Sequence, residues 1–221
     1  QGIVDDSHVS VPGGRSIRDT LAGRGVGDVR VVLAHWHLDH VAGTEAFEGC
    51  QIIANARTAA HLAQHRAGIE DGSFHGAPAI QPLILPDRVF DERLTLDLGG
   101  EVVELICANI HSDDATVLWL PERRVLLAGD TVEDCVTHVG EPAAFDIHLA
   151  DLARLADLGA QRVLPNHGAP EVIAAGGYRA ALLEATADYI RYLQTADLAA
   201  PLTMAQAMGP HLATLRYFAP Y

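Results

Sequence analysis

The alternation of apolar and polar positions predicts strands and helices in turn along the chain. Short apolar, β-branched runs predict buried strands, the clearest of them at 29–34. Alternating runs on either side of Gly99 and Gly100, and of residues 121–124, predict two hairpins. Leucines at every third position from Leu149 to Leu158 share one helical face and predict a helix.

The order of these elements indicates the fold class. Further strands are predicted at 2–6, 51–54 and 162–164, further helices at 16–22, 41–47, 56–65 and 178–193, and a long irregular loop at 66–86. Strands with helices, then hairpins, then strands with helices again favour two sheets with helices packed outside them over a doubly wound parallel sheet. We therefore expect one α/β domain over residues 1–221, with a helical part at 170–221.

Directly after the predicted strand at 29–34 the chain carries a dense group of metal-binding side chains: His35, His37, Asp39 and His40. A turn from a strand into a helix projects side chains from the carboxyl end of a sheet, where ligands are usually held. Because His35 and His37 keep the two-residue period of a strand, both can point toward one ion. A histidine-rich loop without a metal is the alternative, and chance seldom places three His and one Asp within six residues.

Three more candidate ligands each follow a predicted strand: His111, Asp130 and His167. Taken singly, each is a weak signal, because a lone His or a Gly-Asp turn is common; the joint arrangement carries the prediction. Seven nitrogen and oxygen ligands without a thiolate suit two borderline ions that share a carboxylate, Zn²⁺ first, with Fe or Mn as alternatives. His61 and His65 also share a helix face, and solvent exposure explains them better than a metal pair.

The charge balance narrows the class of partner. With 15 Lys and Arg against 29 Asp and Glu, the formal net charge is −14, whereas a nucleic-acid-binding protein needs a basic face. We expect a small-molecule substrate, no nucleic acid and no membrane partner, because no apolar run approaches a membrane span. The sequence carries no signal for an oligomeric state.

The cysteines bear on the compartment. Cys50, Cys107 and Cys135 are odd in number and widely spaced, so they form neither a disulfide framework nor a Cys-x-x-Cys site. A reducing, cytoplasmic location is the resulting expectation. Because the chain opens at Gln1, a removed leader stays open as an alternative.

The run from His35 to His40 resembles the His-x-His-x-Asp-His signature of the metallo-β-lactamase superfamily. Residues 3–5, 111–114, 127–130 and 165–168 resemble its other motifs in order, so the resemblance extends from about residue 3 to 168. It implies a four-layer αββα sandwich, with the first strand or two missing before Gln1. Ala34, Ala42 and the pair at 109–110 depart from the family pattern, and these departures concern loop shape rather than metal ligands.

The resemblance also implies a role for each ligand. His35, His37 and His111 would bind the first metal, while Asp39, His40 and His167 would bind the second. Asp130 would bridge the two ions. A hydroxide shared by such ions is ionised near neutral pH and would serve as the nucleophile. Asp39 is also the ligand best placed to pass a proton, with pure ligation as an equal alternative. Asp5 could orient a ligand His through its second ring nitrogen, with a plain turn aspartate as an equal alternative.

The bond that is cleaved follows less directly. No Gly-x-Ser-x-Gly nucleophile motif occurs. By resemblance, lactamase subclasses carry Cys or Ser where this chain has Asp130, which favours the glyoxalase II-like and lactonase-like branches acting on thioesters and lactones. Three alternatives stay open: a mononuclear iron sulfur-dioxygenase-like enzyme, a β-lactamase-like amide hydrolase and a non-catalytic metal-binding module. Residues 66–86 and 132–142, with Phe74, His75 and His138, are candidates to face the substrate.

Overall fold

A computed structural model describes residues 1–221 apart from 135, 198, 201–202, 209–210 and 212–221. The chain packs into two compact units, Gln1–Cys107 and Ala108–Tyr221, and each is described by itself. That residues 1–221 form one domain therefore stays a prediction. Cys135 lies outside the described residues. Among the helices that the structure describes, none combines the length and hydropathy that a bilayer crossing needs.

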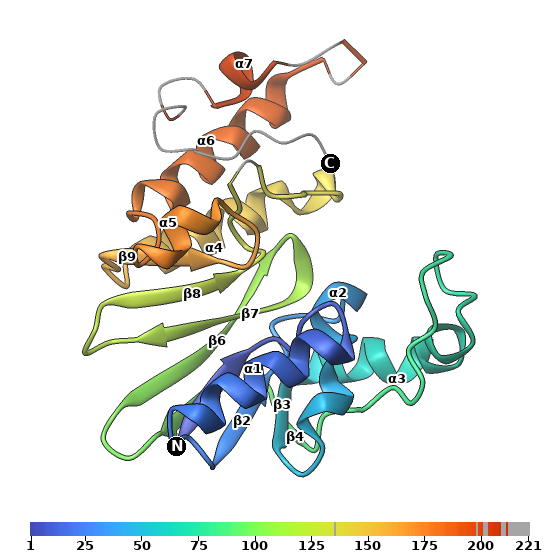
Figure 1. The fold of residues 1–221 in the computed structure, drawn as a ribbon. Helices are drawn as coiled ribbons and strands as arrows, with labels where there is room; N and C mark the ends of the chain where they lie inside the picture. The colour runs from blue at the N-terminus through green and yellow to red at the C-terminus, as the bar shows by residue number, and fades with distance from the viewer. Residues whose placement is uncertain (135, 198, 201–202, 209–210, 212–221) are drawn as a thin grey trace. The chain divides into compact units, whose positions relative to one another are not determined.

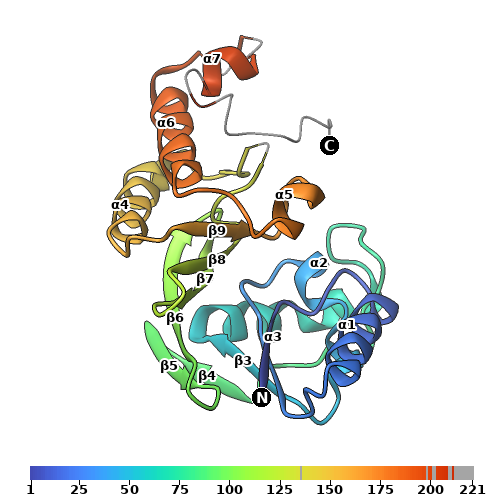
Figure 2. The same cartoon turned by 60° about the vertical axis from the view of Figure 1, so that its left-hand side comes forward.

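The first unit contains a four-stranded parallel sheet with the strand order β1-β2-β3-β4. Its strands are β1 (Gly2–Asp5), β2 (Val29–Val32), β3 (Gln51–Asn55) and β4 (Arg88–Phe90). Parallel neighbours need crossover connections, which are supplied here by helices (Figures 1 and 2). The connecting helices are α1 (Val11–Gly23), α2 (Leu38–Val41), the 3₁₀ helix η1 (Thr44–Phe47) and α3 (Ala56–Asp71).

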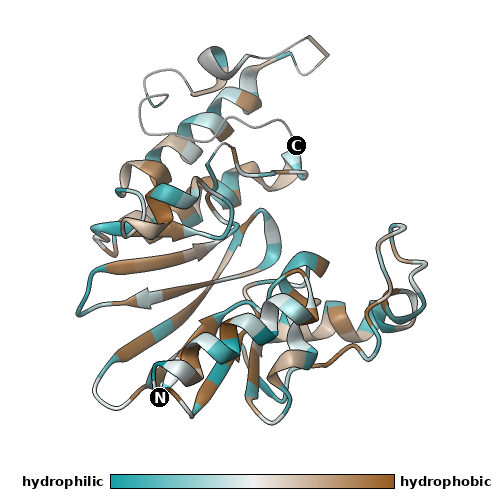
Figure 3. Ribbon diagram, in the orientation of Figure 1, coloured by the Kyte–Doolittle hydropathy of each residue, from teal (hydrophilic) through white to brown (hydrophobic). Residues whose placement is uncertain are grey.

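The core of the first unit lies on both faces of this sheet. Val31, Val32 and Leu33 are each fully buried, as expected for a parallel strand covered on both sides. Phe47 and Leu62 pack into the same region from η1 and α3. Figure 3 shows the corresponding apolar colouring along the strands of this unit. The strand predicted at 29–34 is thus confirmed over Val29–Val32, and residues 33–37 connect it to α2. His35 and His37 therefore lie beyond the strand, and the expectation that they continue its two-residue period is wrong.

Two helix boundaries differ from the sequence prediction, and capping explains both. α1 begins at residue 11 rather than 16 because Ser10 caps it, accepting a hydrogen bond from the backbone of Gly13 at 3.3 Å. α3 continues to residue 71 rather than 65, and it ends where Gly72 adopts a φ of 75°. The irregular stretch predicted at 66–86 therefore begins only after α3.

The single helix predicted at 41–47 is also wrong. The chain forms two short helices, α2 and η1, separated at Ala42 and Gly43. Gly43 explains the break, because a Cβ there would lie 1.9 Å from the carbonyl oxygen of Ser7. The Gly43 amide also donates to the carbonyl of His8 at 2.8 Å. This close approach holds α2 against the segment that leads into α1.

The second sheet has the strand order β5-β6-β7-β8-β9, and the division between the units falls within β6. Its strands are β5 (Arg93–Asp97), β6 (Val102–Ile110), β7 (Ser112–Leu120), β8 (Val125–Gly129) and β9 (Arg162–Pro165). Both predicted hairpins are confirmed, since β5 pairs antiparallel with β6 and β7 with β8, while β9 runs parallel to β8. In the first hairpin Asp97 Oδ1 accepts the amides of Gly99 and Gly100, both at 2.8 Å.

The second unit adds its helices after β8. They are η2 (Pro142–Ala144), α4 (Phe145–Ala156), α5 (Pro170–Ala174), α6 (Ala181–Thr195) and α7 (Met204–Met208). α4 and α6 pack against each other (Figures 1 and 2). α6 begins at residue 181 rather than at the predicted 178, because Tyr178 instead forms a β-bridge with Val163.

We predict opposite effects on stability for two Gly→Ala substitutions in the first unit. Gly43→Ala should lower the free energy of unfolding by about 1–3 kcal/mol, because its Cβ must displace the Ser7 backbone. Gly23→Ala, at the end of α1 with open space around it, should raise stability by up to about 1 kcal/mol. Urea unfolding followed by circular dichroism measures both, and equal effects would contradict the assigned close contact.

Candidate metal centre

The first unit brings four predicted ligands together in what we call the N-terminal ligand cluster: His35, His37, Asp39 and His40. The ring centroid of His35 lies 4.5 Å from that of His37 and 4.1 Å from that of His40. His35 and His40 are buried, whereas the Asp39 side chain is 45% exposed. The connection from β2 to α2 and the first turn of α2 therefore present three imidazoles and one accessible carboxylate in one place.

Asp6 anchors this cluster. One of its carboxylate oxygens accepts the Ala34 amide at 2.7 Å, and the other lies 2.8 Å from Nδ1 of His40. If Nδ1–H of a neutral His40 donates this hydrogen bond to the carboxylate, the lone pair on Nε2 is available to bind a metal ion. Asp6 has a φ of 64°, a left-handed conformation that Asp tolerates better than most residues. The motif pattern points to the neighbouring Asp5 as a candidate for such a role, and the contact with His40 comes from Asp6.

The far side of His40 also faces a carboxylate. Nε2 of His40 lies 3.3 Å from Oδ2 of Asp39, so acceptors stand near both ring nitrogens. A neutral imidazole has one proton and can satisfy only one of them. A cation between Nε2 and Asp39 resolves this conflict. Two ligand atoms bound to one tetrahedral Zn²⁺ at about 2.0–2.2 Å lie roughly 3.3–3.6 Å apart, which this pair matches.

The second unit brings together the other three predicted ligands, which we call the C-terminal ligand cluster: His111, Asp130 and His167. Oδ2 of Asp130 lies 3.6 Å from Nε2 of His111 and 3.4 Å from Nε2 of His167. Both separations are longer than a usual N–H···O hydrogen bond and fall in the range for two ligands of one ion. Asp130 is buried, so its carboxylate is placed between two imidazoles, as a bridging ligand would be.

His111 is fixed from behind in the same manner as His40. Its Nδ1 lies 3.0 Å from the carbonyl oxygen of His138, which directs Nε2 toward Asp130. Glu133, which sequence reasoning missed, is buried with Oε1 3.6 Å from the same Nδ1. No spacing in the sequence distinguishes Glu133 from an ordinary loop carboxylate. His111 also has a φ of 68°, and it is the single residue between the end of β6 and the start of β7.

α4 holds the segment that precedes His111. The Asn109 amide donates to Asp151 at 2.6 Å, and the Asn109 carbonyl lies 2.5 Å from Nδ1 of His148. His148 is buried, so both backbone groups of Asn109 are satisfied by side chains of one helix. The departure from the family pattern at 109–110 thus coincides with a position that is tethered through its backbone.

The loop that carries His167 is fixed by Tyr178. The Tyr178 hydroxyl donates to Asp134 Oδ2 at 2.6 Å and accepts the Ala169 amide at 2.8 Å. The Asp134 amide in turn donates to the carbonyl of His167 at 3.2 Å. Burial, reinforced by the hydrogen bond with Asp134, raises the pKa of the Tyr178 phenol well above its usual value. Tyr178 was predicted to begin a helix, and it instead braces a ligand loop.

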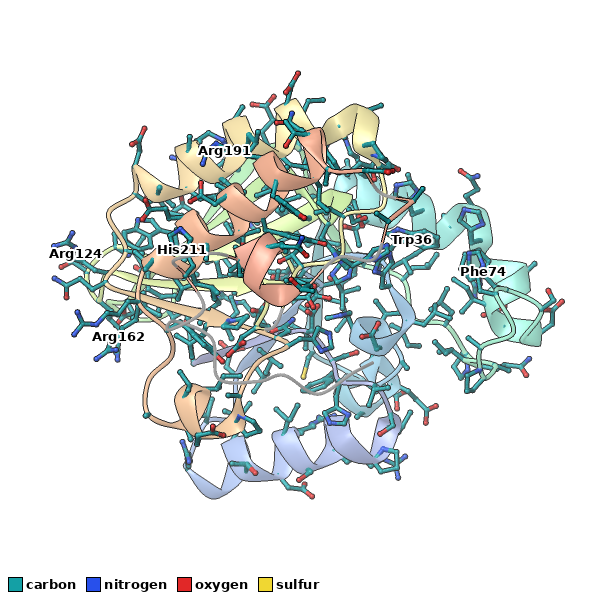
Figure 4. All side chains as sticks on the ribbon, turned by 90° about the horizontal axis from the view of Figure 1, so that it is seen from above. Trp36, Phe74, Arg124, Arg162, Arg191 and His211 are labelled. Atoms are coloured by element: carbon teal, nitrogen blue, oxygen red, sulfur yellow. The ribbon has the colours of Figure 1, made fainter. Side chains whose placement is uncertain are left out.

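Part of the segment expected to face the substrate belongs to an aromatic group around Trp36. Trp36 stacks on His61 and His65 of α3, with ring centroids 5.1 and 5.0 Å away. Phe74 closes the group at 5.4 Å from Trp36, and His75 packs on Phe74 at 4.1 Å (Figure 4). His61 and His65 are therefore aromatic partners of Trp36 rather than freely solvated residues. That these side chains or that of His138 touch a substrate stays a prediction.

The chain is similar in sequence to known proteins. The family model described as the Metallo-beta-lactamase superfamily matches residues 12–193. A curated relative, the Beta-lactamase-like protein 2 homolog of Caenorhabditis elegans, is 26% identical over 140 residues, 62% of this chain. The chain spans 41% of the length of that relative.

Two solved structures show the same fold. The metallo-beta-lactamase from Pontibacter korlensis is 22% identical with a TM-score of 0.67, covering 86% of this chain and 81% of its own. The DIM-1 metallo-beta-lactamase is 20% identical with a TM-score of 0.67, covering 86% and 82%. Likeness at this level of identity shows the fold alone. It confirms the expected α/β class, the four-layer αββα metallo-β-lactamase sandwich.

We predict that Asp6→Asn weakens Zn²⁺ binding by about 10–100-fold. The two carboxylate oxygens of Asp6 contact the Ala34 amide and Nδ1 of His40, and an amide side chain has only one oxygen that can accept a hydrogen bond. Asp19→Asn, on the exposed face of α1, removes the same charge and should leave the affinity unchanged. Competition with a chromogenic chelator measures both affinities. Equal affinities for the two variants would show that Asp6 does not orient a ligand.

We predict that Tyr178→Phe lowers the free energy of unfolding by about 1–3 kcal/mol, because buried Asp134 and the Ala169 amide each lose a partner. Tyr192→Phe, on the part-exposed side of α6, is the matched control and should change stability little. Thermal unfolding compares the two. A neutral Tyr178→Phe would mean that the phenol does not brace the His167 loop.

Proposed function

Because the chain belongs to the metallo-beta-lactamase superfamily, we propose that it is a metal-dependent hydrolase whose two ligand clusters together hold two divalent ions. The observation that supports this most strongly is the repeated separation of imidazole Nε2 and carboxylate Oδ2 atoms. It is 3.3 Å in the N-terminal ligand cluster and 3.4 and 3.6 Å in the C-terminal one. Three such pairs fit shared ions better than hydrogen bonds.

Each ligand has a proposed place. His35, His37 and His111 would hold the first ion, Asp39, His40 and His167 would hold the second, and Asp130 would be shared by both. Nitrogen and oxygen donors without a thiolate favour Zn²⁺, with Fe or Mn as alternatives. Divalent ions bound there would supply an activated water and would polarise the scissile carbonyl.

The protein's own groups have distinct tasks in this proposal. Asp39 is the most exposed carboxylate of the proposed ligands, so it can exchange a proton with solvent or with the leaving group. Asp6 keeps the Nδ1 proton on His40, and the His138 carbonyl does the same for His111. With Nδ1 as the donor in each contact, Nε2 of both neutral imidazoles would be free to bind an ion.

We propose a thioester or lactone as the bond that is cleaved. The support is Asp130. By family resemblance, the glyoxalase II-like and lactonase-like branches have an aspartate at this position, whereas the lactamase subclasses carry Cys or Ser there. β-Lactam amide hydrolysis is the second candidate, and it is favoured by the names of the structurally similar proteins. The strongly acidic charge favours a small-molecule substrate over a nucleic acid.

We predict two zinc ions per chain in protein supplied with zinc, and hydrolysis of thioesters or lactones in a panel that also contains β-lactams and phosphodiesters. Elemental analysis and initial rates measure both. One iron per chain, with thiol-dependent oxygen uptake, would replace the hydrolase with a dioxygenase. Turnover of β-lactams alone would select the second candidate.

Asp130→Asn should lower kcat/KM by at least about 100-fold and reduce the zinc content, because a shared ligand loses its charge. Asp157→Asn, exposed at the end of α4, makes the same chemical change away from the C-terminal ligand cluster and should keep wild-type activity. Unchanged turnover in Asp130→Asn would remove the shared carboxylate from the mechanism.

A further inference from the structure

A pocket of about 570 Å³ lies within the first unit, and Asp39 forms part of its wall. Its other walls come from residues 9–12, which lead into α1, from α2 and η1, and from residues 77–82 in the loop that precedes β4. The volume is in the range of small-molecule sites, about 300–1,000 Å³. The pocket is therefore large enough for a substrate group and is continuous with a proposed metal ligand.

The lining of this pocket is apolar. Ten of its fourteen residues are Val, Leu, Ile, Ala or Pro, and the polar remainder is Ser10, Gln81, Asp39 and Glu45. No Lys or Arg stands among these described lining residues, although Arg15 lies 3.7 Å from Glu45 outside the wall. The only charges on the wall itself are thus carboxylates, in a chain whose net charge is −14.

Two further features indicate that an apolar group is bound here. Val9 is 59% exposed at the pocket, one of three large apolar side chains that the structure describes as exposed. Ala42, where the family pattern has Gly, adds its methyl group to the same wall. A larger pocket of about 730 Å³ in this unit has no predicted metal ligand in its wall, so it lacks this connection to the chemistry.

We propose that this pocket holds the neutral, apolar acyl or alkyl chain of the substrate and discriminates against chains that end in an anion. The inference rests on the proposed function, because Asp39 is both part of the wall and a proposed ligand. Each methylene group that leaves water for an apolar wall gains binding free energy. A terminal carboxylate instead loses its hydration against an apolar wall that has no Lys or Arg among its described lining residues.

A series of neutral p-nitrophenyl esters from acetyl to decanoyl tests this specificity. We expect kcat/KM to rise about three- to fourfold per methylene until the pocket is filled. An ester of equal length that ends in a carboxylate should be at least about tenfold poorer. A flat series, or one that favours the carboxylate, would overturn the proposal.

Two variants localise the effect to this pocket. Val11→Trp fills the wall at the start of α1 and should remove the preference for long chains. Val89→Trp, on β4 and 51% exposed outside the pocket, is the matched control and should keep the preference. Loss of the preference in both variants, or in neither, would place the chain elsewhere.

Binding of the neutral ketone decan-2-one, measured by calorimetry, separates this inference from the hydrolase itself. Ketone binding that Val11→Trp weakens at least about tenfold would support the pocket. If the wild-type protein binds the ketone in this way and turns over no ester, only the proposed function is overturned. Ester turnover with neither ketone binding nor a chain-length preference overturns only the pocket. Ultracentrifugation tests whether a second copy of the chain occupies the pocket. Self-association of the wild-type protein that is lost in Val11→Trp would show this, and it would overturn the proposal that the pocket binds the substrate chain.

Discussion

The carboxylate of Asp6 is the contact on which the N-terminal ligand cluster depends. One oxygen fixes the backbone at Ala34, at the end of β2, and the other fixes the ring of His40 in α2. A single buried group thereby links the segment after β2 to the helix that carries Asp39 and His40. The close approach of Gly43 to Ser7 adds a contact between the residues that follow α2 and the segment that carries Asp6.

The C-terminal ligand cluster is built by the same principle with different residues. His111 and His167 are held through backbone and side-chain hydrogen bonds from His138, Asp134 and Tyr178. These partners are buried or lie in loops, where an unsatisfied polar group is costly, so each contact stabilises one loop conformation. Imidazoles whose rear nitrogen is already committed are suited to zinc chemistry, because the forward nitrogen is left to bind the ion.

The proposed substrate has two parts, a polar ester-like carbonyl and an apolar chain, and the proposed metal centre and the apolar pocket would each bind one of them. The ligand clusters account for an ester-like carbonyl and a water molecule, and the wall formed by Val9, Val11 and Leu38 accounts for a neutral chain. The acidic character of the protein is consistent with both, since it disfavours anionic substrates and attracts divalent cations. Specificity in this view comes from residues 9–12 and 77–82, outside the motifs that identify the family.

Short-range periodicity and the order of the motifs were enough to predict most strands, both hairpins and the candidate metal ligands. They also indicated the two-sheet class. That Asp6 contacts His40, and that Tyr178 braces a loop instead of starting a helix, became visible only in the folded chain. Glu133 and the apolar pocket were equally invisible, since they depend on contacts between residues far apart in the chain, for which neither spacing nor composition leaves a signal.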